Sequence, residues 1–316
     1  MRPQIAEAHQ ELRRDPEPLG PDSLTWKHFG DWRGILIALY SGSMQNMHPQ
    51  LGAGVEEHSR FFDERWERLY RSLYPIGGVV YDGPRARETA LAVRGYHETI
   101  KGIDKHGRPY SALNPETWTW AHATFVMTTI LSAETFGKGL TLAEKEQIWD
   151  EGKQWYRLYG VTDRELPDTY ADFVAYYDRI CRTVLEDNKA ARDVLDIKRI
   201  GKPPALPWLP DALWPVLRFP ITRGFVWLTV GLYPQPVREL LGYRWTAVDQ
   251  VLFRVVGRSI SIGWNVVPRE YRYHPRARAG WRRERTGRVE PLIETPARNL
   301  PPMLERDKPT HYSPAD

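Results

Sequence analysis

The stretch 114–133 constrains the fold of this chain more than any other part of the sequence. Asn114 is a good N-cap, Pro115 suits the first helical position, and Gly137 is a residue type that ends helices. From residue 117 onward the stretch contains no Asp, Glu, Lys or Arg, and its single histidine is His122. The pattern predicts a central helix that carries one imidazole in apolar surroundings.

On a helix, His122 shares its face with apolar side chains: Trp118 lies four residues before it, and Phe125 and Val126 three and four after it. One interpretation is a core histidine satisfied by a neighbouring carbonyl or hydroxyl group. The other is an axial ligand of a flat apolar cofactor such as haem, which needs a nitrogen donor and water-excluding surroundings. The helix alone favours the structural interpretation.

The composition is that of a globular protein with a sizeable core. The 316 residues are 41% hydrophobic and 12% aromatic, and the net charge of +4 is too small to indicate nucleic acid. Cys181 is the single cysteine, which excludes an intramolecular disulfide and a cysteine-based zinc site. No apolar run is long enough to span a membrane, and the polar start lacks a signal-peptide core, so the sequence predicts a cytoplasmic protein.

Hydrophobic periodicity and breaker residues predict an all-α, single-domain protein with few strands. The glycines at 52–55 indicate a turn, and residues 75–84 a break. The proline-rich segment 201–220 is expected to cross the surface stiffly and to pack Trp208 and Trp214 against the same core. The expected helices lie at about 30–45, 61–74, 85–100, 115–136, 141–159, 168–184 and 236–266.

Two groups of arginines have a plain structural interpretation. Arg68 and Arg71 each follow a glutamate by four residues, Glu64 and Glu67, the order that favours surface ion pairs and a solvated face. The arginine-rich run 276–288 leaves open an interaction with nucleic acid or a membrane surface. Such a run is more often a solvated helix end.

The histidine spacing excludes the common helical metal motifs. None of the nine histidines has a glutamate three residues before it, and no two are four apart, so di-iron and zincin spacings are absent. The sequence also lacks a Gly-x-Ser-x-Gly elbow and a phosphate-binding loop. A cofactor held by one histidine is therefore the economical basis for catalysis.

Several short motifs occur in the order of a known family. They include Gly30-Asp31-x-Arg33, Met47-His48-Pro49, Gly54-Val55-x-x-His58-Ser59, Arg68-Leu69-x-Arg71-Ser72, Pro109-Tyr110, Asn114-Pro115, Trp120-x-His122 and Arg238-x-x-Leu241-Gly242. Their joint order and spacing resemble the MpaB-type oxygenases, which share their catalytic domain with the latex-clearing rubber oxygenases. The resemblance covers about residues 20–280.

The resemblance implies a globin-like helical core that holds haem b (iron) through one proximal histidine. The matching position is His122, and Trp118, Phe125 and Val126 on the same helix are expected to contact the cofactor. The resemblance therefore favours the interpretation of His122 as a haem ligand over that of a core histidine.

On the distal side of the haem, the resemblance implies a catalytic segment that reads Arg68-x-x-Arg71-Ser72 here, with Arg68 also near the cofactor. Arg71 stands where rubber-cleaving members carry a lysine, and a guanidinium is a poor iron ligand because it hardly ever deprotonates. The sixth coordination position is thus expected to be open. Arg68 is expected to stabilise negative charge on reduced oxygen.

The implied function is a haem-dependent oxygenase that uses dioxygen to cleave or oxygenate a double bond of an apolar olefinic or prenylated small molecule. A haem sensor, carrier or peroxidase-like protein is the alternative, because likeness in fold does not establish turnover. The expected divisions are a lead-in at 1–19, the haem-binding oxygenase domain at 20–288 and a proline-rich tail at 289–316.

Overall fold

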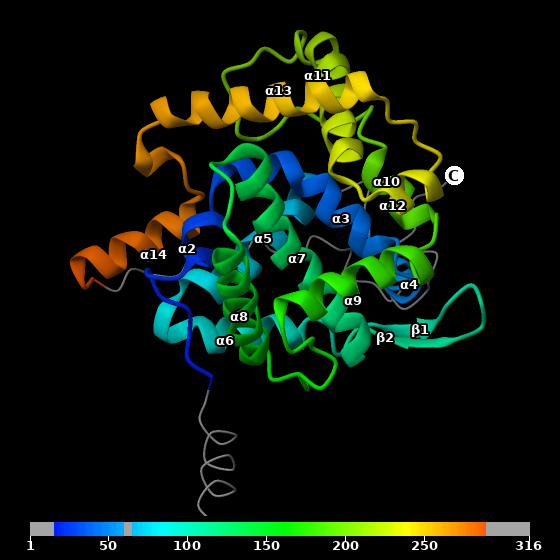
Figure 1. The fold of residues 1–316 in the computed structure, drawn as a ribbon, viewed down its shortest axis with the longest axis vertical. Coiled ribbons are helices and arrows are strands. Elements are labelled where there is room, and N and C mark those ends of the chain that lie inside the picture. Colours follow the sequence, from blue (N-terminus) through cyan, green and yellow to red (C-terminus); the bar gives the residue numbers. More distant parts are fainter. Residues whose placement is uncertain (1–15, 60–64, 289–316) are drawn as a thin grey trace, which may run out of the picture.

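The computed structural model describes residues 16–59 and 65–288, and helices account for nearly all of their regular structure (Figure 1). The prediction of a mainly helical protein is confirmed, whereas the globin-like core stays a prediction. The helices are α2 (Leu24–His28), η1 (Trp32–Ile37), α3 (Ala38–Asn46), α4 (Pro49–His58), α5 (Arg65–Tyr81), η2 (Gly83–Arg85), α6 (Ala86–Gly95), α7 (Pro115–Phe136), α8 (Leu142–Leu158), α9 (Tyr170–Thr183), α10 (Lys189–Leu195), α11 (Trp214–Leu232), α12 (Gln235–Leu240), α13 (Ala247–Gly263), η3 (Trp264–Val266), η4 (Arg269–Tyr271) and α14 (Pro275–Thr286).

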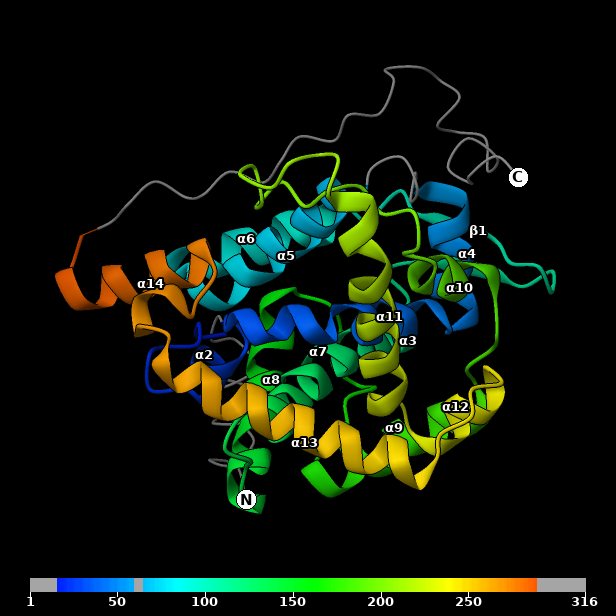
Figure 2. The same ribbon diagram turned by 90° about the horizontal axis from the view of Figure 1, so that it is seen from above.

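The predicted central helix is α7. The side chain of Asn114 accepts a hydrogen bond from the Glu116 amide at 3.0 Å, Pro115 occupies the first turn, and Gly137 follows the last residue. α7 contacts α2, η1, α3, α8 and α13, and Figures 1 and 2 both show it in the middle of the molecule. α7 carries His122 and packs against α8, which supplies the surroundings of that histidine.

Two clusters of buried apolar side chains fill the interior. The larger cluster includes Trp120 of α7 and Trp149 of α8, together with residues of α3, α9 and α11. The second includes Trp26 of α2, Trp118 of α7 and Trp155 of α8, together with residues of α5, α6 and α14. Because α7 and α8 contribute to both clusters, their shared interface lies between them.

The described strands form one small hairpin. β1 (Lys101–Ile103) pairs antiparallel with β2 (Pro109–Ser111) and lies against α4. Within the turn, Asp104 Oδ1 accepts hydrogen bonds from the His106 and Arg108 amides, each at 2.9 Å. The expectation of few strands is confirmed.

The predicted break at Pro75 is wrong, because α5 continues through it to Tyr81. A proline inside a helix removes one backbone hydrogen bond and crowds the preceding turn. The residues beyond it are strongly buried, since Val79, Val80 and Tyr81 are each 0% exposed. Their burial offsets the local cost of Pro75.

The predicted turn at 52–55 is also wrong, because α4 runs through these glycines. A Cβ atom at Gly52 would lie 2.6 Å from Asn188 Nδ2 and 2.6 Å from the Asn46 carbonyl oxygen. Gly52 is therefore required for close packing of α4 against α3 and α10, and its presence does not signal a turn.

The expectation for the segment 201–220 holds for one tryptophan only. Trp214 begins α11, is 6% exposed and donates through Nε1 to the Ile200 carbonyl at 3.0 Å. Trp208 is 74% exposed, so its predicted packing into the core is wrong. Trp208 lies in the irregular segment before α11 and is therefore not on the buried face of a helix.

The long helix predicted at 236–266 is divided into α12 and α13. Gly242 adopts a positive φ of 72° between them, and Thr246 then starts α13 with a capping box that includes Asp249. The side chains of Glu64 and Glu67, the lead-in 1–15 and the tail 289–316 lie outside the described part, and so do the predictions made for them.

Candidate functional site

His122 lies at the interface of α7 with α8 and is 2% exposed. Its Nε2 atom lies 2.8 Å from the carbonyl oxygen of Gly152. Burial lowers the pKa of His122 to about 4, while the bond to this carbonyl acts in the opposite direction. Because a carbonyl can only accept, the neutral imidazole has its proton on Nε2 and its lone pair on Nδ1. Nδ1 is buried and has no hydrogen-bond partner among the described residues.

Aromatic rings of α8 and of Tyr159, which caps its C-terminal end, pack against His122. The ring centroids of Trp155, Tyr156 and Tyr159 lie 4.9, 5.3 and 6.4 Å from that of His122, all edge-on. Of the residues expected to line the cofactor, Phe125 stacks on Trp155 at 6.1 Å. These contacts agree with the structural interpretation of His122, in which a neighbouring carbonyl satisfies a core imidazole.

Trp118 and Val126 lie one helical turn before and one after His122 on α7. A Cβ atom at Gly152 would lie 2.8 Å from Val126 Cγ2, so α7 and α8 are in close contact there. Trp118 packs edge-on against Tyr159 at 5.4 Å and against His97 at 5.2 Å. Ring contacts thus run from His122 through Tyr159 and Trp118 to a second histidine, His97.

His97, which the sequence interpretation passed over, follows the end of α6. Its Nδ1 atom lies 2.8 Å from the Val93 carbonyl oxygen, so its proton is on Nδ1 and its lone pair on Nε2. No hydrogen bond of Nε2 occurs within the described ranges. Burial lowers the pKa of His97 below its ordinary value. A histidine oriented by a backbone carbonyl, with the other nitrogen free, is the usual arrangement of a metal ligand.

The sequence prediction held no signal for this contact. In the expected helix 85–100 the Val93 carbonyl would accept from the backbone amide of His97. Because α6 ends at Gly95, that carbonyl is instead available to the His97 ring.

The predicted catalytic segment lies in the first half of α5. Arg68 donates to the Ser59 hydroxyl at the end of α4, Arg71 is partly buried, and Ser72 is exposed. Arg68 and Arg71 are therefore not fully solvated. Arg68 contacts the end of α4, whereas the ring of His122 contacts α8.

α4 connects this arginine segment to α7 and to the hairpin. The Thr117 hydroxyl donates to Gln50 Oε1 at 2.6 Å, and the Tyr110 hydroxyl donates to the carboxylate of Glu57. His48, at the N-cap of α4, is 4% exposed, and burial lowers its pKa to about 4. Its Nδ1 atom has no hydrogen-bond partner in the described part of the chain. α4 is thus the element that positions Arg68 relative to the start of α7.

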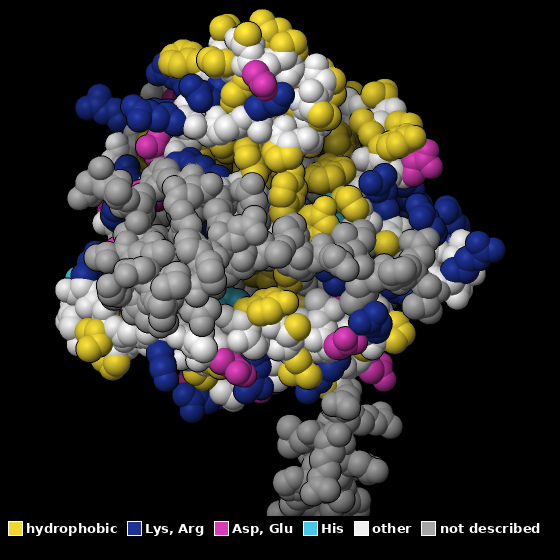
Figure 3. Space-filling model, turned by 180° about the vertical axis from the view of Figure 1, so that it is seen from behind, with side chains coloured by type: hydrophobic (Ala, Val, Ile, Leu, Met, Phe, Trp, Pro, Cys, Tyr) yellow, Lys and Arg dark blue, Asp and Glu magenta, His cyan; other side chains and the backbone are white. Residues whose placement is uncertain are grey.

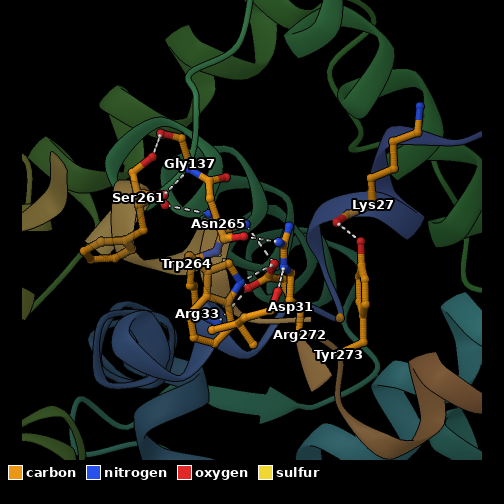
Figure 4. A network of polar contacts seen from close by, with 12 residues as sticks. Lys27, Asp31, Arg33, Gly137, Ser261, Trp264, Asn265, Arg272 and Tyr273 are labelled. Atoms are coloured by element: carbon orange, nitrogen blue, oxygen red, sulfur yellow. Dashed lines mark hydrogen bonds and ion pairs between the residues drawn. The ribbon is translucent and has the colours of Figure 1, made fainter. Parts of the chain in front are cut away.

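The Gly30-Asp31-x-Arg33 motif has a structural role at the other end of α7 (Figure 4). Arg33 binds both carboxylate oxygens of Asp31 at 2.9 and 2.7 Å and donates to the Phe136 carbonyl at 2.6 Å. Trp264 Nε1 donates to Asp31 at 3.2 Å, and the Ser261 hydroxyl donates to the Gly137 carbonyl at 2.7 Å. This network fixes the C-terminal end of α7.

Members of the arginine-rich run also serve the fold. Arg276 forms a buried ion pair with Asp82, with Nε 2.9 Å from Oδ1, and the two side chains are 5% and 3% exposed. Arg283 donates to the Tyr81 carbonyl at 2.9 Å. These two arginines attach α14 to α5 and are not available to a surface ligand.

The fold and the site define a mainly helical protein in which the buried imidazole of His122 and the half-buried imidazole of His97 lie among aromatic rings. In residues 16–59 and 65–288, no group of three or more His, Cys, Asp or Glu side chains is arranged to hold a metal ion.

Residues 26–262 match the family model described as ER-bound oxygenase mpaB/B'/rubber oxygenase, catalytic domain. The chain belongs to this family and is an oxidoreductase of the oxygenase type. The resemblance seen in the sequence motifs is thereby confirmed. Comparisons with curated proteins and with solved structures gave no match.

Proposed function

We propose that this protein is a haem b-dependent oxygenase that uses dioxygen to cleave or oxygenate a carbon–carbon double bond of an apolar olefinic or prenylated small molecule. Membership of the oxygenase family supports the reaction class. The observation that carries the cofactor assignment is the imidazole of His97, held by the Val93 carbonyl with Nε2 free.

His97 and His122 are each the type of nitrogen donor that a haem takes as its protein ligand. A haem requires a neutral imidazole as axial ligand, and burial lowers the pKa of both His97 and His122. His97 would donate through Nε2, and this is the ligand we favour. His122, the ligand expected from the sequence, is the second candidate and would donate through its buried Nδ1 atom.

The aromatic residues around these histidines would exclude water and bind apolar groups. Trp118 contacts both His97 and Tyr159, and Phe125 stacks on Trp155. When bound, haem supplies the dioxygen chemistry that side chains alone lack. A dry, apolar site suits an olefinic substrate, because charged or strongly polar compounds would lose their hydration there.

Arg68, Arg71 and Ser72 are proposed as the catalytic segment. Arg68 already donates to Ser59, so its guanidinium is oriented before substrate arrives. A guanidinium remains protonated and can donate hydrogen bonds to negative charge that develops during oxygen reduction. Arg71 would not bind the iron of a haem, because its guanidinium hardly ever loses a proton, and it would instead donate hydrogen bonds.

The proposal also includes the extent of the haem-binding domain and the cellular compartment of the protein. We infer that residues 20–288 form one haem-binding domain and that the protein works in the cytoplasm. Contacts between α14 and α5 support the inclusion of residues up to 288, because they attach the last described helix to the second core cluster.

The test combines spectroscopy with product analysis. Protein produced with added haem is expected to show a Soret band, and with a short polyprenyl compound under ¹⁸O₂ to form carbonyl products that contain the label. A folded protein that retains no haem contradicts the cofactor assignment. Haem retention without oxygen-dependent product favours a sensor or carrier instead.

A further inference from the structure

One end of the molecule exposes apolar side chains on α11 and α13. Val216 and Phe219 of α11 are 70% and 63% exposed, and Val248, Val251 and Val255 of α13 are 67%, 57% and 55% exposed. Figure 3 shows hydrophobic side chains gathered at the top of the molecule, the end where Figure 1 places both helices. We refer to these five residues as the apolar end.

The apolar end is additional to the face by which α13 packs on the protein. Phe253, Gly257 and Ser261 are buried, and a Cβ atom at Gly257 would lie 2.6 Å from the Thr135 carbonyl oxygen of α7. At 100° per residue, Val251 and Val255 lie on nearly the opposite face of the helix. α13 therefore has one apolar face in the core and a second without a partner in the described chain.

Exposed arginines accompany the apolar end. Arg223, Arg254 and Arg258 are exposed, and the ion pairs of the described residues include none of them. The guanidinium of Arg223 lies 4.9 Å from the ring centroid of Phe219, so charge and apolar surface are adjacent. α11 has no acidic residue, and Asp249 of α13 is engaged in the N-terminal cap. The surface thus combines apolar area with uncompensated positive charge.

We propose that the apolar end docks on the surface of an anionic lipid bilayer. Valine and phenylalanine side chains would enter the region below the headgroups, while arginines bend back toward lipid phosphates. Docking would be peripheral, because no described helix is long and apolar enough to cross a membrane. A second copy of the chain is a poorer occupant, since a two-fold contact would bring arginines of both copies together without acids.

Vesicle sedimentation of the full chain tests the proposal. The protein is expected to pellet with vesicles of phosphatidylcholine and phosphatidylglycerol, more weakly with phosphatidylcholine alone, and less as salt concentration rises. The double variants Val251→Asp/Val255→Asp and Arg254→Gln/Arg258→Gln should each lower the bound fraction roughly tenfold. Ile103→Asp is the matched control, because Ile103 is 64% exposed and belongs to β1, which Figure 1 places at the opposite end of the molecule from α11 and α13.

Circular dichroism of each variant checks that the helices are retained. Equal binding by wild type and both double variants, or no binding to either vesicle, overturns the proposal. Analytical ultracentrifugation tests the alternative that a second copy of the chain covers the apolar end. A wild-type dimer that Val251→Asp/Val255→Asp converts to monomer, with no vesicle binding, would assign the apolar end to a second copy.

Discussion

The Nδ1 atom of His97 lies 2.8 Å from the carbonyl oxygen of Val93, one helical turn before it. His122 has the reverse arrangement, with Nε2 toward the Gly152 carbonyl and Nδ1 buried without a partner. The two imidazoles therefore present different nitrogens to a ligand. Variants in which each histidine is replaced in turn can therefore show which imidazole binds the iron.

The first prediction assigns the axial ligand. His97→Ala is expected to remove most of the Soret absorbance per folded protein, because the Val93 carbonyl holds Nδ1 and would leave Nε2 to the iron. His122→Ala should retain the band but unfold at lower urea concentration, since it leaves a cavity and the Gly152 carbonyl unpaired. Absorption spectra and urea titrations of both variants make the comparison.

His106→Ala serves as the surface control, because His106 is exposed and paired with Glu186. The ligand assignment would be reversed if the Soret band disappeared in His122→Ala and persisted in His97→Ala, with circular dichroism unchanged in both.

The second prediction concerns Arg68. Arg68→Ala should reduce turnover by about 100-fold, near the lower end of what loss of one charge-stabilising donor costs. Haem content should change little, because the negative charge appears only during oxygen chemistry. Arg68→Lys keeps the charge and should recover part of the rate. Arg85→Ala, at an exposed ion pair with Glu88, is the control. Equal turnover in Arg68→Ala and wild type would remove Arg68 from the mechanism.

The third prediction is a loss of stability in acid through His274. Burial, followed by the nearby charges of Arg276 and Arg278, lowers the pKa of His274 to about 4 from an ordinary 6.5. Between these values the unfolded chain binds a proton that the folded chain does not, so stability falls as pH decreases from 6.5 toward 4. The slope for this group is up to about 1.4 kcal/mol per pH unit.

His274→Asn is the variant that isolates the effect. Asparagine can still cap α14, as His274 does by accepting from the Ala277 amide at 3.2 Å, but it does not titrate. Urea midpoints at pH 7 and pH 5 should therefore differ less in the variant than in wild type. An identical pH dependence would show that His274 does not contribute.

The fourth prediction concerns the buried pair of Asp82 and Arg276. Arg276→Met should lower the free energy of unfolding by about 3–5 kcal/mol, because it leaves a buried carboxylate without its counterion. The double variant Asp82→Asn/Arg276→Met should lose less than the sum of the single variants. Denaturant titrations of the four proteins give the coupling free energy. A loss below about 1 kcal/mol for Arg276→Met would instead indicate a pair that behaves as if solvated.

Local sequence predicted the helices that have their own start and stop signals. α7 has Asn114 and Pro115 at its start, and α8, expected at 141–159, starts with a capping box formed by Thr141 and Glu144. The continuation of α5 past Pro75 depends on burial by distant helices, which no local pattern contains. Gly52 likewise has its reason in Asn188, far along the chain. Tertiary packing decided both positions against the local signal.

The sequence predicted apolar surroundings for His122 but not the contacts of its ring. An apolar helix with one histidine pointed to His122, and the structure places that residue in aromatic surroundings as expected. The state of its nitrogens depends on a carbonyl of another helix, Gly152, which sequence periodicity cannot indicate. The same limit applies to His97, because its contact with Trp118 joins separate helical segments.

The network around Asp31 has a consequence for synthesis of the chain in the cell. Trp264 is 233 positions later than Asp31, and Arg276 is 194 positions later than Asp82. Contacts so distant in sequence form slowly and late. A nascent chain that has emerged from the ribosome only as far as α11 lacks the residues that fix α5 and complete the anchor of α7. The contacts of His97 and His122 lie within residues 93–159, so the histidine region can form before these two distant anchors close around it.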